Sequence, residues 1–128
     1  MAKEVLLIDD STHDRILTSH FFSNINIDID AIDDMQAIQK GKDFFEAYKT
    51  IIIDWNLARI SGLELAKMIR HVVPNAQIIL TSSLLTNSMK QEAIRNNFHY
   101  LCEKDFKFEY VNYCAHIMEH RHFMSFDA

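Results

Sequence analysis

The sequence contains very little glycine and proline, with two Gly and one Pro among 128 residues. These residues mark turns, flexible linkers and low-complexity segments. Their scarcity excludes collagen-like repeats and leaves no stretch with the composition of an interdomain linker. A chain of this length fits one domain built around a single hydrophobic core.

Cysteine and long apolar runs are also scarce. Cys102 and Cys114 are the only cysteines, and they lack metal-site spacing, so we expect reduced packing residues in a cytoplasmic protein. An apolar run such as Val5–Ile8 has four residues, whereas a membrane-spanning helix needs about 20. Acids follow Ile8 directly, which argues against a signal peptide.

Positive charge is in deficit. The formal net charge is −5 and lysine and arginine form no cluster, which argues against a nucleic-acid partner. Neither a nucleic acid nor a membrane is therefore expected as a partner.

Short apolar runs alternate with helical patterns along the chain. Five runs read as buried strands of a parallel sheet, at 4–8, 27–32, 50–53, 77–82 and 99–103. Helical patterns follow them, opening at the N-cap Ser11 and then at about 34–47, 62–72, 86–97 and 106–122. Five strand–helix units predict a doubly wound α/β domain.

Polar side chains stand where the predicted strands end. They are Asp9, Asp10, Asp54, Ser82 and Lys104. In doubly wound sheets ligands bind at the carboxyl ends of the strands, so we expect these groups to converge on one edge. Three carboxylates opposite one ammonium suit Mg²⁺, and a carboxylate beside both cations suits nucleophilic attack on phosphorus.

Four segments carry a resemblance to a known family. "VLLIDDS", "IIIDWNLARISGLELAKMIR", "PNAQIILTSS" and "YLCEKDF" together resemble the receiver domain of two-component response regulators, of the single-domain chemotaxis-regulator type. The resemblance implies a flavodoxin-like (βα)5 fold with a five-stranded parallel sheet in the order 2-1-3-4-5. It further implies a receiver domain over residues 1–122, a C-terminal tail over 123–128, and no output domain.

The resemblance also implies roles for individual residues. Asp54 matches the phospho-acceptor, and Lys104 matches the lysine that pairs first with it and then with the phosphoryl oxygens. Asp10 would bind Mg²⁺ directly, with Asp9 beside it, and Asn56 would offer its backbone carbonyl to the metal.

The switch hydroxyl at the end of the fourth strand is either Ser82 or Thr81. Ser82 fits the family spacing from both flanking motifs without a gap, and Thr81 is the alternative. The side chains of neighbouring strand residues point to opposite faces, so only one of the two can serve.

The sequence departs from the family pattern at several positions. Ala58 stands where the family has a proline, and Asp105 replaces the proline after the lysine. Leu101 occupies the position of the switch aromatic, and a leucine cannot reproduce an aromatic rotamer change. Asn97 replaces a glycine at a helix end, a mild change because Asn tolerates left-handed backbone. None of these changes removes a ligand or the nucleophile.

The last predicted helix carries two apolar stripes. One stripe, which includes Val111 and Cys114, is sufficient for docking on the sheet. The second consists of Phe106, Tyr110, Tyr113 and Ile117. Either neighbouring helices cover it, or it forms an interface with a partner or with a second copy in a homodimer.

The resemblance predicts the function and its partners. The chain would accept a phosphoryl group from phosphohistidine of a histidine kinase or a histidine phosphotransfer protein, with Mg²⁺. It would then change its affinity for a downstream effector protein, or pass the phosphoryl group on in a phosphorelay. The alternatives are a receiver-fold scaffold that is not phosphorylated, and a Mg²⁺-dependent phosphohydrolase with an aspartyl-phosphate intermediate.

Overall fold

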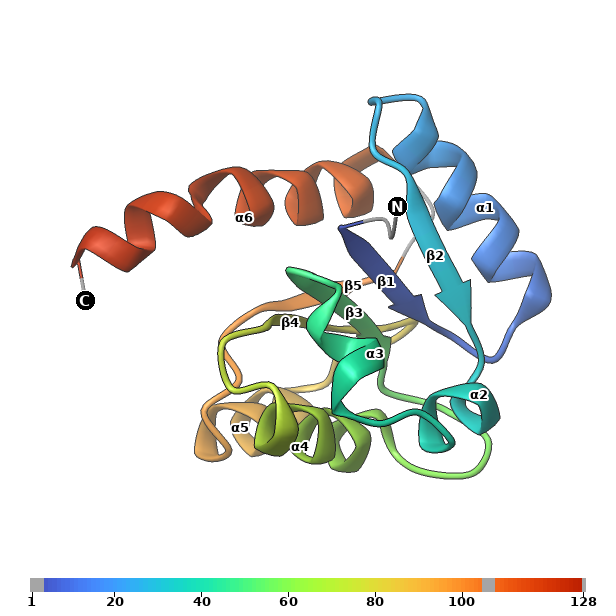
Figure 1. Cartoon of the computed structure of the whole chain (residues 1–128), viewed down its shortest axis with the longest axis vertical. Helices are drawn as coiled ribbons and strands as arrows, with labels where there is room; N and C mark the ends of the chain where they lie inside the picture. Colours follow the sequence, from blue (N-terminus) through green and yellow to red (C-terminus); the bar gives the residue numbers. More distant parts are fainter. Residues whose placement is uncertain (1–3, 105–107, 128) are drawn as a thin grey trace.

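The computed structural model describes residues 4–104 and 108–127, which form one α/β unit (Figure 1). The strands are β1 Val5–Ile8, β2 Ile29–Ile32, β3 Thr50–Asp54, β4 Gln77–Ser82 and β5 Leu101–Glu103. The helices are α1 Thr12–Ser23, α2 Asp34–Ile38, α3 Lys42–Glu46, α4 Gly62–Val72, α5 Asn87–Arg95 and α6 Phe108–Asp127.

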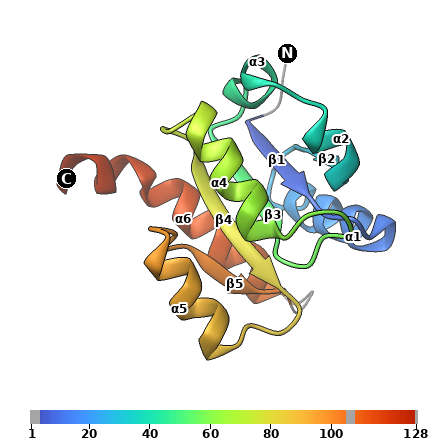
Figure 2. The same cartoon turned by 90° about the horizontal axis from the view of Figure 1, so that it is seen from below.

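The sheet has five strands in the order β2-β1-β3-β4-β5, and every neighbouring pair is parallel. The predicted doubly wound fold and its strand order are therefore confirmed. All five strands run toward the same end of the sheet, where the loops that follow β1, β3 and β4 gather (Figure 2).

Each face of the sheet has its own apolar core. Alternating strand residues such as Leu6, Ile51 and Ile53 pack with the helices α2 to α5 on one face. Their neighbours Leu7 and Ile52 pack with α1 and α6 on the other. Burial on both faces explains the nearly continuous apolar strands in the sequence.

The helix predicted over 34–47 is in fact two short helices. Asp33 begins α2 with a capping box. The Asp33 side chain accepts from the Gln36 N–H, and the Gln36 side chain accepts from the Asp33 N–H. Gly41 then caps α3, accepting hydrogen bonds from Phe44 and Phe45. Glycine is unfavourable inside a helix, so the break falls where continuation costs most.

The last helix is longer than predicted and buries part of its second stripe. α6 continues to Asp127, so the predicted tail over 123–128 is helical through that residue, and its C-terminal turns project beyond the sheet (Figure 1). The side chains of Tyr110 and Ile117 are buried in the core beside the sheet. The predicted interface is wrong for these two residues, because the sheet and α1 cover them. Tyr113 is half-buried, and Phe106 lies outside the described residues.

No helix in the described part of the chain has both the length and the apolar character needed to cross a membrane.

Candidate functional site

Lys104 gathers carboxylates from three parts of the chain at the carboxyl edge of the sheet. Its Nζ lies 2.8 Å from Oδ2 of Asp9, the residue after β1, and 3.0 Å from Oδ2 of Asp54, the last residue of β3. The Lys104 side chain is only 2% exposed. Strand-end placement thus brings together residues that are 95 and 50 positions apart in the sequence.

For Lys104 and for Asp54, burial and the neighbouring charges shift the pKa in opposite directions. Burial alone would lower the pKa of the Lys104 ammonium, but the carboxylates of Asp9 and Asp54 outweigh it and raise that pKa above its usual value. Burial raises the pKa of the Asp54 carboxyl group, and Lys104 offsets only part of this rise. The lysine is therefore held as a cation, whereas the fold disfavours the charge on Asp54.

Asp14 is a third carboxylate on Lys104, which the sequence analysis missed. Its Oδ2 lies 3.0 Å from the lysine Nζ. Burial raises the pKa of Asp14, but Lys104 outweighs that effect and the net pKa is lowered. The signal in the sequence was the N-cap Ser11, whose Oγ accepts from the Asp14 N–H at 3.2 Å. This capped first turn places Asp14 against the strand end.

Asp10 is hydrogen-bonded to two backbone amides. Its Oδ1 accepts a hydrogen bond from the backbone N–H of Asp34 at 3.0 Å, and its Oδ2 accepts one from the backbone N–H of Ala58. The Ala58 N–H exists because alanine, unlike proline, retains an amide proton. The loop between β3 and α4 is thereby attached to the end of β1.

Asp34 and Arg59 form a second attachment of the same loop. Asp34 is fully buried, and its two carboxylate oxygens accept from the Arg59 N–H at 2.6 Å and from Arg59 Nη1 at 2.9 Å. Burial tends to raise the pKa of Asp34, yet these bonds lower it overall. Sequence reasoning missed this pair because it joins loops 25 residues apart with no motif.

The two candidate switch hydroxyls have different surroundings. Ser82 Oγ accepts from Asn56 Nδ2 at 3.2 Å and donates to the Leu84 carbonyl at 2.9 Å. Thr81 Oγ1 is buried with no hydrogen-bond partner in the described structure. Thr81 contacts the loop after Asp54 through its backbone carbonyl, which accepts from the Trp55 N–H at 2.7 Å. Of the two hydroxyls, that of Ser82 is the one hydrogen-bonded to this loop, which favours Ser82 over Thr81. Leu101 is half-buried against the core on the α4 and α5 face.

Gly62 fixes the other end of this loop. Its N–H donates to the Trp55 carbonyl at 2.8 Å. A Cβ at position 62 would clash with the Asp54 carbonyl oxygen and lie 2.6 Å from Trp55 Cα. Only glycine therefore lets α4 begin directly against the residue that ends β3.

The donor set fits a hard divalent cation, but the carboxylates are turned to other partners. Asp9, Asp10 and Asp54 with the Asn56 carbonyl supply the oxygen ligands that Mg²⁺ prefers. Among the residues described, no group of three or more acidic, histidine or cysteine side chains is arranged as a metal site.

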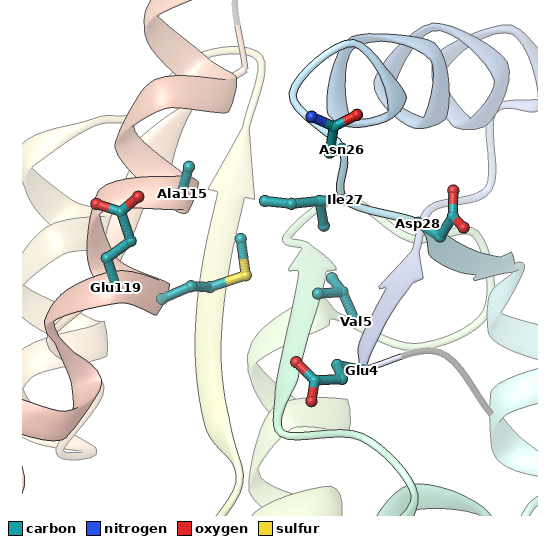
Figure 3. A pocket seen from close by; sticks show the side chains of 8 residues that line it. Glu4, Val5, Asn26, Ile27, Asp28, Ala115 and Glu119 are labelled. Carbon is teal, nitrogen blue, oxygen red and sulfur yellow. The ribbon is translucent and has the colours of Figure 1, made fainter. Parts of the chain in front are cut away.

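A pocket lies at the opposite, amino edge of the sheet (Figure 3). It measures about 460 Å³. Its lining residues are Glu4, Val5, Asn26, Ile27, Asp28, Ala115, Met118 and Glu119. None of them is Lys104 or one of its carboxylate partners Asp9, Asp14 and Asp54, so this pocket does not mark the candidate site.

Comparisons with known proteins agree with this geometry. The model of the response regulator receiver domain matches residues 5–112. A chemotaxis protein CheY from Thermotoga maritima is 27% identical over 97 residues, which cover 74% of this chain and 79% of that protein. The chain therefore belongs to the response regulator receiver domain family.

Solved structures share the fold at low identity. The signal receiver domain of a putative Luxo repressor protein from Vibrio parahaemolyticus superposes with a TM-score of 0.79 at 19% identity, covering 98% of this chain and 95% of that one. A response regulator protein from Burkholderia pseudomallei, described with a phosphorylated aspartic acid, a calcium ion and citrate, gives 0.64 at 16% identity, covering 84% and 62%.

Proposed function

We propose that this receiver domain accepts a phosphoryl group on Asp54, with Mg²⁺, from phosphohistidine of a histidine kinase or a histidine phosphotransfer protein. The observation that carries the proposal is the position of Lys104, whose Nζ lies 3.0 Å from Oδ2 of Asp54 while also contacting Asp9. A buried cation beside a carboxylate at the strand edge is the arrangement expected for a nucleophile toward phosphorus.

The transfer needs few protein groups. A carboxylate oxygen of Asp54 attacks phosphorus, and the P–N bond of the donor breaks with its electron pair returning to the imidazole. The ammonium of Lys104 already lies beside the attacking carboxylate. It would therefore stabilise the negative charge that develops on the phosphoryl oxygens during the transfer. Mg²⁺, when bound by Asp9, Asp10, Asp54 and the Asn56 carbonyl, would supply further charge neutralisation.

The hydroxyl of Ser82 is proposed as the group that responds to the phosphoryl group. Ser82 Oγ is bonded to the side chain of Asn56 and to the Leu84 carbonyl. Exchange of these bonds for one to the phosphoryl group would move the segment after β4, with Leu101 adjusting on β5. The changed surface would alter affinity for an effector protein, or the phosphoryl group would pass onward in a phosphorelay.

Two similar proteins support this proposal. The Burkholderia pseudomallei structure is described with a phosphorylated aspartic acid and a divalent cation. The Thermotoga maritima relative is a chemotaxis protein.

Acetyl phosphate with Mg²⁺ tests the proposal directly. Intact-protein mass spectrometry should show the gain of one phosphoryl group, which chelation of Mg²⁺ with EDTA abolishes. Asp54→Asn should show no gain, whereas the matched control Asp43→Asn, at an exposed position in α3, should behave as the wild type.

Absence of the mass gain, or its retention in Asp54→Asn, would overturn the proposal. A folded chain that acquires no phosphoryl group would instead be a receiver-fold scaffold. Turnover of a generic phosphate ester would favour a phosphohydrolase, although Asn56 stands where such enzymes carry a second acid.

A further inference from the structure

The carboxylate of Asp10 is held by two loops at once. Its two oxygens accept one backbone N–H each, from Asp34 at the start of α2 and from Ala58 in the β3–α4 loop. Each of these bonds has an ionised acceptor, which makes it stronger than a neutral hydrogen bond. One N–H on each oxygen leaves each oxygen a second lone pair, but the two bonds restrain the direction in which those lone pairs point.

The same loop is tied down a second time, one residue later. The Arg59 N–H and its guanidinium both bond to the fully buried Asp34. The paired bonds from one residue fix the orientation of the carboxylate as well as its distance. Ala58 and Arg59 are themselves exposed. The same loop also packs Trp55, Leu57 and Ile60 against the core, so these polar contacts add to apolar packing in holding the loop.

We propose that Ala58 and Asp34 are positioning residues that hold Asp10 away from the metal site, so that Mg²⁺ binds only when the β3–α4 loop releases Asp10. This inference rests on the proposed function, since it assigns Asp10 to the metal. Divalent-cation binding is then coupled to movement of the loop that carries Trp55 and Asn56. The Arg59–Asp34 pair sets how far the loop moves.

Hydrogen exchange of the Ala58 backbone amide measures its contact with Asp10 directly, without any phosphorylation. In the metal-free wild-type chain, amide hydrogen exchange measured by NMR should show the Ala58 N–H protected despite its exposed position. Saturating Mg²⁺ should reduce that protection by about tenfold, because the bond to Asp10 is worth roughly one decade in an equilibrium constant. The Val73 N–H, which donates to the Ile69 carbonyl at the far end of α4 and outside this loop, is the control and should stay protected.

A proline substitution removes the amide proton itself. Mg²⁺ affinity can be followed by the fluorescence of Trp55, the only tryptophan. Ala58→Pro should bind Mg²⁺ about tenfold more tightly than the wild type, since one restraint on Asp10 is absent. Ala58→Ser keeps the N–H and should bind within about twofold of the wild type.

Three results would overturn the inference. They are free exchange of the Ala58 amide without metal, protection that Mg²⁺ leaves unchanged, and an Ala58→Pro affinity equal to or weaker than wild type. If Ala58→Pro does not fold, the exchange result decides alone. Failure of the proposed function looks different, because Mg²⁺ would still release the Ala58 amide while acetyl phosphate adds no mass to Asp54.

Discussion

Replacement of Lys104 by methionine tests the central contact of the site. Methionine fills most of the volume of the lysine stem but carries no charge. In the wild type, the ammonium lies 2.8 to 3.0 Å from carboxylates of Asp9, Asp14 and Asp54. Removing one partner of a buried ion pair costs about 3–5 kcal/mol, because the remaining charges are left uncompensated. Lys104→Met should therefore lower the free energy of unfolding by about 4 kcal/mol.

Urea denaturation at pH 7 measures this loss. With a slope of about 2 kcal/mol per molar urea, the midpoint should fall by about 2 M. Lys90→Met is the matched control at an exposed position in α5, and it should change stability by about 0.5 kcal/mol at most. A loss of less than about 1 kcal/mol in Lys104→Met would show that the lysine does not compensate the buried acids, and the electrostatic argument would fail.

Three further substitutions test neighbouring contacts. The lowered pKa of Asp14 means that its ionised form stabilises the fold at neutral pH and that this contribution is lost as pH falls through the lowered pKa. Asp14→Asn should thus cost about 1 kcal/mol at pH 7, and urea titrations at decreasing pH should show that cost shrinking. Gly62→Ala should lower the free energy of unfolding by about 3 kcal/mol, or leave the chain unfolded by circular dichroism. Gly41→Ala, where a Cβ meets open space, should lower it by less than about 1 kcal/mol. Equal effects of the two substitutions would refute the steric argument. Ser82→Ala should lower the free energy of unfolding by about 1–2 kcal/mol, because the hydrogen bonds of the Ser82 hydroxyl are lost. Thr81→Val should not destabilise the chain, since no hydrogen bond of the Thr81 hydroxyl is lost. A larger loss for Thr81→Val than for Ser82→Ala in thermal unfolding would contradict the assignment of the two hydroxyls.

Side chains at the ends of strands could be placed from the sequence, because the position of a residue in a parallel strand determines the edge of the sheet on which it lies. Buried strands were visible as short apolar runs, and parallel strands place their carboxyl ends on one edge. Asp9, Asp54 and Lys104 could therefore be brought together from the sequence. The start of α4 at Gly62 was equally readable, because Ser61 is an N-cap whose Oγ accepts from Glu64.

The contacts that were missed depend on the path of loops. The family resemblance assigns Asp10 to the metal, which stays a prediction, and it gave no indication that this carboxylate accepts from the amides of Asp34 and Ala58. Backbone donors leave no residue-type signal in a sequence, so such a contact cannot be read from it. The pair of Arg59 with Asp34 likewise depends on two loops meeting in space.

Helical periodicity was also insufficient for α6. Tyr110 and Ile117 lie at a spacing that predicts a separate stripe, yet both are buried with Val111 and Cys114. A helix that crosses a twisted sheet beside another helix buries a wider arc than one flat contact requires. The width of the apolar arc therefore indicated burial by two neighbours rather than a free surface.

Stability and the proposed chemistry oppose each other at Asp54. Burial raises the pKa of its carboxyl group even though Lys104 is adjacent, so folding at neutral pH works against the ionised form that nucleophilic attack requires. Asparagine keeps the shape and an oxygen for Lys104 while removing the charge, and the lysine keeps Asp9 and Asp14 as partners. Asp54→Asn should thus raise the free energy of unfolding of the metal-free chain while abolishing the phosphoryl mass gain. A destabilised Asp54→Asn in urea denaturation would mean that the ionised carboxylate supports the fold, and that its charge is retained for structure rather than for reaction.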